Sequence, residues 1–211
     1  MSKIPLLVFA KAPVPGKVKT RLQSHCTAEQ AAAIARILLE STLEKVCKFW
    51  PGPVLISTWL DETHPALMAL AEEHKVEIVS QVNGDLGTKM RESFFDYGYP
   101  MAIIGSDAPH IKPDSLVEAH QILASGNSVI GPSDDGGYYL IGLNEGADTI
   151  FEDHSWGDDS VLSSTLSKCD SIGLSLNQLE PLQDIDTWSD LLAAKGEVPS
   201  LDEYLSAEGL I

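Results

Sequence analysis

The most distinctive segment of the chain for chemistry is a basic loop near its start. Four of the 14 lysines and arginines lie between Lys11 and Arg21, although the chain carries a net charge of −17. Residues 4–10 are apolar and predict a buried strand. A strand that leads into a loop with glycine and basic residues is typical of an anion site, because backbone N–H groups and basic side chains converge there. We therefore predict an anion site made of Lys11, Gly16, Lys17, Lys19 and Arg21.

The loop matches no standard phosphate motif. It lacks the second glycine of the Walker A pattern, and the G-x-G-x-x-G fingerprint of dinucleotide-binding proteins is absent. A solvated basic turn is therefore the alternative interpretation.

Acidic residues follow two other predicted strands. Asp107 comes directly after a fully apolar strand, where an aspartate binds a divalent metal or a ribose, or else caps the next helix. Asp134 and Asp135 precede two glycines, Gly136 and Gly137. These glycines would let the backbone approach a ligand closely, which favours a functional role over the alternative of a simple hairpin turn.

Two further polar segments are candidates for the same site. Asp184 and Asp186 share one side of an extended segment, because side chains alternate along a strand. They suit a metal ion, or they cap the following helix. Gln81, Gly84 and Asp85 follow the third predicted strand and would contact a base or sugar, whereas the alternative is an ordinary loop with Asp85 at a helix N-terminus.

Two aromatic-type residues outside these segments are weaker candidates. Trp156 would stack on a sugar or base, or else belong to the core. His110 is the one histidine of six that lies close to a candidate acid, Asp107.

Composition limits the kind of protein. The length of 211 residues predicts one domain, residues 1–211, with a substantial core. The acidic balance argues against nucleic-acid and anionic-membrane partners, and no apolar stretch is long enough to span a bilayer. Three widely spaced cysteines fit a reducing cytoplasm. The acidic surface is compatible with either a monomer or a homodimer.

Hydrophobic periodicity predicts the elements that position these residues. Strands are expected at 4–10, 54–57, 76–79, 101–105, 128–131 and 138–142. Helices are expected at 28–50 behind a capping box, 65–74, 86–97, from Pro113 onward, 158–168, 188–194 behind Thr187, and after Ser200. This alternation predicts an α/β fold with a mostly parallel sheet and helices on both faces, and ligands bind at the carboxyl ends of such strands.

The segments 9–22, 81–87, 105–109, 131–143 and 184–187, with Trp156, together resemble one bacterial family in order and spacing. It is a family of glycosyltransferase-like proteins, also called radical-SAM/selenodomain-associated transferases. The resemblance covers nearly the whole chain and implies the GT-A fold of nucleotide-diphospho-sugar transferases. The phospholactate and molybdenum-cofactor guanylyltransferases are more distantly similar.

The resemblance implies a role for each candidate residue. The basic loop would hold the nucleotide phosphates, and Gln81, Gly84 and Asp85 would lie near the nucleoside. Asp107, completed by Asp184 or Asp186, would bind Mg²⁺ or Mn²⁺. The acceptor would face Asp134, Asp135, Gly136, Gly137 and Trp156.

Three positions depart from the family pattern. Ser106-Asp107-Ala108 is not a D-x-D pair, so a single carboxylate remains for the metal there. Lys89, which we also predict to bind the nucleotide, stands where arginine is expected; it keeps the charge and loses the bidentate geometry. Trp188 replaces a proline.

These observations predict a cytoplasmic, Mg²⁺- or Mn²⁺-dependent transferase. The expected reaction is glycosyl transfer from a nucleotide sugar to a small-molecule acceptor, with Asp135 as the base and Asp134 as second candidate. One alternative is guanylyl or cytidylyl transfer from a nucleoside triphosphate to a phosphorylated acceptor, which releases pyrophosphate. Another is a nucleotide-binding regulatory protein without turnover.

Overall fold

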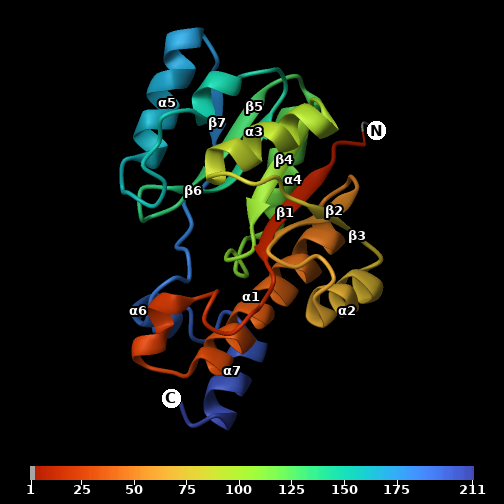
Figure 1. Cartoon of the computed structure of the whole chain (residues 1–211). Helices are drawn as coiled ribbons and strands as arrows, with labels where there is room; N and C mark the ends of the chain where they lie inside the picture. Colours follow the sequence, from red (N-terminus) through yellow and green to blue (C-terminus); the bar gives the residue numbers. More distant parts are fainter. Residues whose placement is uncertain (1–2) are drawn as a thin grey trace.

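The computed structural model describes residues 3–211, which are built around a central seven-stranded sheet (Figure 1). The spatial order of its strands is β3-β2-β1-β4-β6-β5-β7. Every neighbouring pair is parallel except those of β6, which runs antiparallel to both β4 and β5. The strands are β1 (Leu6–Lys11), β2 (Val54–Trp59), β3 (Glu77–Ser80), β4 (Met101–Gly105), β5 (Ser128–Pro132), β6 (Tyr138–Leu143) and β7 (Leu176–Gln178).

Helices cover both faces of the sheet. One core cluster packs α1, α2 and α4 against one face, and a second packs α3, α5 and the 3₁₀ helix η2 against the other. Alternate residues of β1 divide between the clusters, since side chains alternate along a strand: Leu6 and Val8 belong to the first and Leu7 to the second. These helices are α1 (Ala28–Phe49), α2 (Pro65–His74), α3 (Leu86–Tyr97), α4 (Pro113–Ala124), α5 (Val161–Ile172) and η2 (Asp148–Phe151).

A third core cluster lies beyond the sheet, around the first half of α1 (Figure 1). There the 3₁₀ helix η1 (Thr20–Ser24) and the two last helices, α6 (Trp188–Ala193) and α7 (Pro199–Ala207), pack on α1. Ile185, which directly precedes Asp186, is buried in the same cluster. The end of the chain is therefore held against the segment that follows the basic loop.

The fold class and most of the elements are confirmed. The capping box of α1 is present, with Gln30 N–H donating to Thr27 Oγ1 and Thr27 N–H donating to Gln30 Oε1. The helix predicted at 158–168 begins and ends later, at 161 and 172. The last helix is not capped by Ser200, because Pro199 already lies in its first turn and Val198 is the N-cap.

The topology places the candidate segments at one edge of the sheet. β1, β2, β3, β4, β5 and β7 run in the same direction, so their carboxyl ends share this edge. β5 and β6 are joined by a hairpin of residues 133–137, which adds the turn containing Asp134 and Asp135 to the same edge. After β7 the chain returns along it toward α6, and Ser133 pairs with Leu182 in an isolated bridge.

Candidate active site

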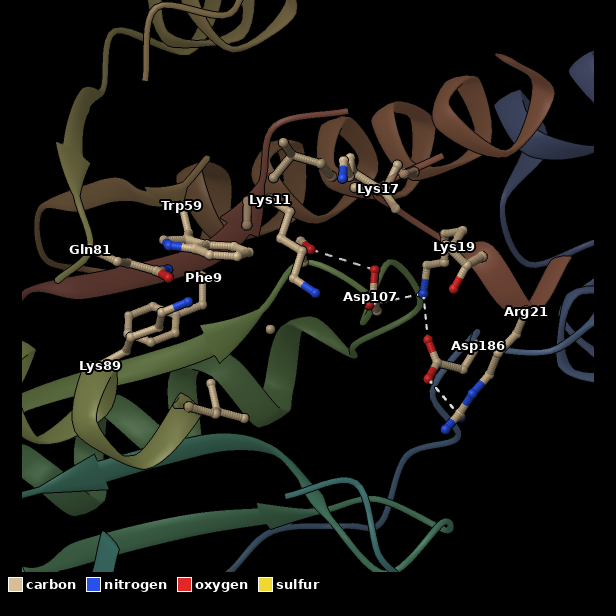
Figure 2. Close-up of a pocket in the computed structure, with 18 residues that line it drawn as sticks. Phe9, Lys11, Lys17, Lys19, Arg21, Trp59, Gln81, Lys89, Asp107 and Asp186 are labelled. Atoms are coloured by element: carbon tan, nitrogen blue, oxygen red, sulfur yellow. Dashed lines mark hydrogen bonds and ion pairs between the residues drawn. The ribbon is translucent and has the colours of Figure 1, made fainter. Parts of the chain in front are cut away.

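A cavity of about 570 Å³ opens at the carboxyl ends of β1, β2, β3 and β4 (Figure 2). We call the part lined by Lys17, Lys19 and Arg21 the basic end, and the part lined by Phe9, Trp59, Gln81 and Lys89 the aromatic end. The predicted site residues that line the cavity are Lys11, Lys17, Lys19, Arg21, Gln81, Lys89, Asp107 and Asp186. The structure therefore brings nucleotide-site and metal-site candidates together in one cavity.

The backbone of the basic loop turns sharply at two residues. Gly16 has a φ of 77°, and Lys19 adopts the left-handed conformation with φ 43° and ψ 42°. This conformation is uncommon for a residue other than glycine and is held here by the surrounding contacts. Lys17 and Arg21 remain exposed, whereas the Lys19 side chain is 5% exposed. The loop is therefore more than a solvated turn.

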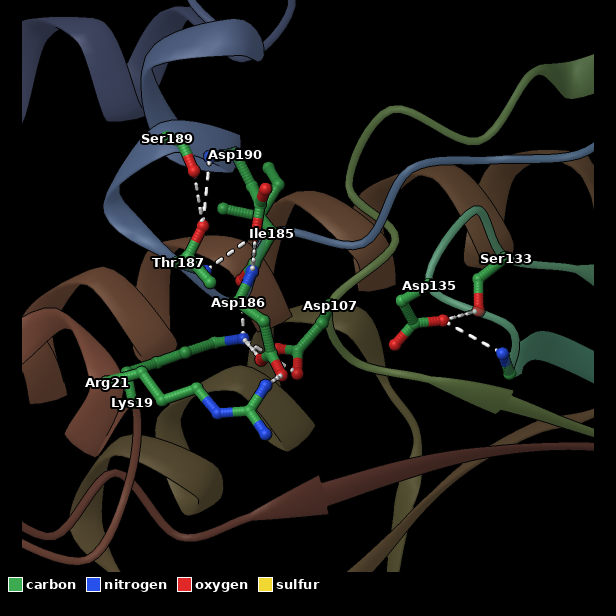
Figure 3. Close-up of polar contacts among 11 residues, drawn as sticks. Lys19, Arg21, Asp107, Ser133, Asp135, Ile185, Asp186, Thr187, Ser189 and Asp190 are labelled. Atoms are coloured by element: carbon green, nitrogen blue, oxygen red, sulfur yellow. Dashed lines mark hydrogen bonds and ion pairs between the residues drawn. The ribbon is translucent and has the colours of Figure 1, made fainter. Parts of the chain in front are cut away.

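Lys19 joins three parts of the chain (Figure 3). Its ammonium lies 2.9 Å from Asp107 Oδ2 and 2.8 Å from Asp186 Oδ1, and donates to the carbonyl oxygen of Ile185 at 2.6 Å. An ammonium has three N–H donors, so these oxygens occupy all of them. Burial disfavours the charged lysine, but Asp107 and Asp186 outweigh it and raise the pKa of Lys19. In this state Lys19 holds carboxylates. Lys17, which forms no ion pair with a described residue, and Arg21, whose exposed guanidinium lies 3.3 Å from Asp186, are left to meet an incoming anion.

Neither Asp107 nor the late aspartates cap a helix. The N-cap of α4 is Lys112, and that of α6 is Thr187. The N–H of Asp186 instead donates to Asp190, and its side chain pairs with Lys19 and with Arg21 at 3.3 Å. Lys19 lowers the pKa of Asp186 against the opposing effect of burial. The capping alternatives are excluded for these aspartates.

Asp184 is the aspartate of this acidic group whose negative charge is least compensated by neighbouring positive charge. Burial, followed by the charges of Asp107, Asp135 and Asp186, raises the pKa of Asp184 to about 8. Neighbouring carboxylates raise one another's pKa when too little positive charge lies near them. A divalent cation would supply that charge, and carboxylate oxygens are suitable ligands for Mg²⁺ or Mn²⁺. Within residues 3–211, however, no three His, Cys, Asp or Glu side chains are already arranged as a metal-ligand set. The chemistry fits a divalent cation, and Lys19 holds two of the carboxylates that would bind it.

Asp135 lies in the β5–β6 hairpin near this acidic group. Its Oδ1 accepts hydrogen bonds from the Ser133 hydroxyl and from the N–H of Gly137 at 2.9 Å (Figure 3). Gly136 has a φ of 86°, and a Cβ there would lie 2.0 Å from the carbonyl oxygen of Asp159. The hairpin interpretation is therefore correct for the backbone. The same turn fixes the Asp135 carboxylate, whose charge contributes, after burial and Asp107, to the raised pKa of Asp184. Asp134 is exposed.

The aromatic end contains two residues, Phe9 and Trp59, that were not predicted as site residues. Trp59 is the last residue of β2 and pairs in register with Lys11, and Phe9 lies two residues earlier on β1. The Lys89 ammonium sits 3.9 Å from the centre of the Trp59 ring. Burial, and then the charge of Lys11, lowers the pKa of Lys89. The strand predicted at 54–57 stopped two residues before Trp59, and the position of Trp59 just after that strand was the available signal.

The predicted residues that lie outside the cavity lining are Gly16, Gly84, Asp85, Asp134, Asp135, Gly136, Gly137, Trp156 and Asp184. Asp85 is the N-cap of α3 and accepts from the N–H of Thr88 at 2.8 Å, so the capping alternative describes its contacts. Hydrogen bonds from Thr88 lower the pKa of Asp85. Gly84, with φ 146°, packs against Thr88. Trp156 packs with the second core cluster and covers Gly87, as its core interpretation expected.

Comparison with solved structures places this site in a known fold. A protein of Desulfovibrio desulfuricans, provisionally named a nucleotide-diphospho-sugar transferase, has a TM-score of 0.86 and 27% identity over 100% of this chain and 97% of its own. The inositol-1-phosphate CTP transferase of T. maritima has a TM-score of 0.63 and 13% identity over 97% of both chains. A Mycobacterium tuberculosis protein in complex with manganese has a TM-score of 0.56 and 14% identity over 94% of this chain and 100% of its own.

The chain thus has the nucleotide-diphospho-sugar transferase fold. None of the curated proteins matches it. Among residues 3–211 no helix is long and apolar enough to cross a membrane. A family model described as "Uncharacterized protein conserved in bacteria (DUF2064)" matches residues 42–158, which is more than half of the sequence. The chain therefore belongs to the DUF2064 family of bacterial proteins.

Proposed function

We propose that this protein transfers a glycosyl group from a nucleotide sugar to a small-molecule acceptor. The observation that carries the proposal is the unbalanced charge of the cavity. Lys11, Lys17 and Lys89 line it and form no ion pair with any described residue, although the chain as a whole is strongly acidic. A pocket that collects cations beside aromatic rings suits a ligand with phosphates at one end and a planar base at the other.

Each end of the cavity has a part in the reaction. Lys17 and Arg21 bind the diphosphate and neutralise the charge that develops on it as the bond to the sugar breaks. The purine or pyrimidine ring of the nucleotide lies at the aromatic end. Asp107, Asp184 and Asp186 would hold a Mg²⁺ or Mn²⁺ ion, which would supply further positive charge to the leaving group.

Asp135 is the proposed general base, the group that deprotonates the acceptor. It lies on the acidic side of the site, and its two hydrogen bonds fix the direction of its carboxylate. It takes the proton of the acceptor hydroxyl while the hydroxyl oxygen bonds to the anomeric carbon and the nucleoside diphosphate leaves. Gly136 and Gly137 are proposed to face the acceptor. Trp156 would affect acceptor binding only indirectly, through its packing against α3.

Nucleotidyl transfer is the second candidate. It is favoured by the fold of the T. maritima CTP transferase, whose topology covers nearly all of this chain. The same basic loop would hold a triphosphate, and a phosphorylated acceptor would attack the α-phosphorus, with pyrophosphate as the leaving group.

The released phosphate distinguishes these functions. The purified protein is incubated with Mn²⁺ and a panel of nucleotide sugars and nucleoside triphosphates, with water and a set of sugars and sugar phosphates as acceptors, and followed by ³¹P NMR. Nucleoside diphosphate supports glycosyl transfer, and pyrophosphate supports nucleotidyl transfer. Binding without any product would indicate a regulatory protein, and no binding would contradict both proposals.

Asp135→Asn tests the base. General-base catalysis contributes about 10²- to 10⁴-fold, so we expect turnover to fall by that factor while nucleotide affinity changes little. Asp134→Asn is the matched control from the same turn and should keep most of the activity. Loss of turnover in Asp134→Asn but not in Asp135→Asn would assign the general base to Asp134. Normal turnover in both variants would show that neither aspartate of the hairpin is the general base.

A further inference from the structure

Lys89 is a buried cation that lacks an anionic partner. The residue is 8% exposed, and no carboxylate of the described residues lies within ion-pair distance of its ammonium. Its contact is the face of Trp59. A buried charge is costly unless it is paired, and the neighbouring charge of Lys11 adds to the cost. A ligand oxygen with negative charge or a strong carbonyl dipole would supply what this position lacks.

Gln81 presents the complementary group. The backbone N–H of Gln81 donates to the carbonyl oxygen of Thr58, and its side-chain Nε2 donates to the carbonyl oxygen of Ser57, both at 2.8 Å. A carbonyl can only accept, so the amide must turn its NH₂ toward Ser57 and keep Oε1 for another partner. Figure 2 shows the Gln81 amide and the Lys89 ammonium on the same side of Trp59, within the cavity. The aromatic end therefore offers a donor and an acceptor next to an aromatic ring.

We propose that this end of the cavity selects nucleotides whose base has a carbonyl beside a ring N–H, namely uracil, thymine and guanine. The inference rests on the proposed function, because it assumes that the cavity binds a nucleotide. In these bases the ammonium of Lys89 donates to the carbonyl oxygen, and the adjacent ring N–H donates to Gln81 Oε1. Both polar groups are satisfied by one edge of one planar ring.

Adenine and cytosine cannot satisfy both groups in this way. Adenine has no carbonyl. The carbonyl of cytosine is flanked by a ring nitrogen that carries no hydrogen, which would face Gln81 Oε1 as a second acceptor. If cytosine or adenine instead turned its amino group to Gln81, only a ring nitrogen would remain for Lys89. A buried ammonium that loses its oxygen partner weakens binding, which is the basis of discrimination at such sites.

The test is isothermal titration of UDP, TDP, GDP, CDP and ADP into the protein with Mn²⁺. We expect UDP, TDP and GDP to bind about tenfold or more tightly than CDP and ADP. Lys89→Met should reduce that preference to about threefold or less, and Lys89→Arg, which keeps a donor, should retain most of it. Lys17→Met should weaken all five nucleotides by a similar factor and leave their ratios unchanged. Thermal melting of each variant checks that it is folded.

Two results would overturn the inference. CDP or ADP binding as tightly as UDP and GDP would show that the aromatic end does not read the carbonyl, and an unchanged preference in Lys89→Met would remove Lys89 from the selection. Either result leaves the proposed function standing, because a nucleotide still binds. Failure of all five nucleotides to bind would overturn the proposed function and this inference together.

Discussion

At the residue scale, Lys19 places a fixed positive charge among the carboxylates that would bind a metal. Its three donors are taken by Asp107, Asp186 and the Ile185 carbonyl, so the basic loop is tied to the late acidic segment without any ion. A divalent cation that uses both carboxylates must displace this ammonium. Lys19 is therefore expected to compete with the metal in the nucleotide-free protein.

Lys19→Met should raise the affinity of the nucleotide-free protein for Mn²⁺. Removing the competing ammonium frees both carboxylates, and we expect Mn²⁺ to bind about tenfold more tightly, a gain of about 1.4 kcal/mol. Electron paramagnetic resonance of free Mn²⁺ measures this without any turnover. Lys17→Met, which removes an exposed charge of the same loop, is the control and should change the affinity little. Equal affinities in Lys19→Met and wild type would place the metal elsewhere.

Asp184 gives the site a distinct pH dependence. Its pKa in the folded protein is about 8 against an ordinary value of 3.8, so between these values the folded state holds a proton that the unfolded state has lost. The free energy of unfolding therefore falls as the pH rises from about 4 to about 8. Below this window the carboxyl is protonated in both states, and above it the ionised, buried group is destabilising.

Asp184→Asn should remove this penalty. In EDTA at pH 8.5 we expect the variant to be more stable than wild type by about 1 to 3 kcal/mol, since a pKa difference of one corresponds to about 1.4 kcal/mol. The gain should shrink toward pH 5. Thermal melting across this range measures it, with exposed Asp134→Asn as the control. A difference that does not vary with pH would mean that the variant acts through packing alone.

At the scale of elements, α3 carries Lys89 to the aromatic end, and its first turn fits closely against the second core cluster. A Cβ on Gly87 would lie 2.2 Å from the carbonyl oxygen of Phe151 and 2.7 Å from the Trp156 ring. Lys89 is two residues further along the same helix. A displacement of the helix start would therefore move the ammonium relative to Trp59.

Gly87→Ala should destabilise the protein and weaken nucleotide binding together. Overpacking of this kind costs about 1 to 3 kcal/mol. Gly146→Ala is the matched control, because a Cβ there meets nothing closer than the Tyr99 ring at 3.9 Å and its backbone is not in the left-handed region. Urea unfolding measures stability, and titration with UDP measures binding. If Gly87→Ala were as stable as Gly146→Ala, the result would contradict the close packing of α3 against Trp156.

The elements also show which features a sequence can predict. α2 and α3 begin and end as expected, because proline or aspartate marks their starts and apolar residues recur at helical spacing. β7 was not predicted, since only one of its three residues, Leu176, is apolar and the strand lies at an edge of the sheet. Asp107 was selected because it follows an apolar strand, and Asp186 because it shares one side of an extended segment with Asp184. Trp59 was missed because the predicted strand ended at residue 57, two residues short of the strand end that places Trp59 at the cavity.

At the scale of the whole molecule, the site depends on contacts between the two ends of the chain. Lys19 and Asp186 are 167 residues apart in sequence, and Ile185 is anchored in the third core cluster with η1, α1, α6 and α7. No local pattern could predict that pairing, because it depends on the return of the chain along the sheet edge after β7. We propose that residues 1–211 act as one domain, in which the last helices hold the acidic segment at the cavity.

Leu191→Ala tests this dependence, and Leu192→Ala is its neighbour in α6. Leu191 is 0% exposed in the third cluster, whereas Leu192 is 44% exposed. Truncating a buried leucine costs about 2 to 5 kcal/mol, while an exposed one changes stability by about 0.5 kcal/mol or less.

If the chain is one cooperative unit, Leu191→Ala lowers a single melting transition by about 4 to 20 °C, and hydrogen exchange at residues 183–187 rises with it. Leu192→Ala should leave both unchanged. A second transition in Leu191→Ala, with the sheet still melting at the wild-type temperature, would mean that α6 and α7 form a separate unit. In that case Lys19 would keep Asp107 and lose the support that holds Asp186 in place, and the acidic segment would open independently of the cavity.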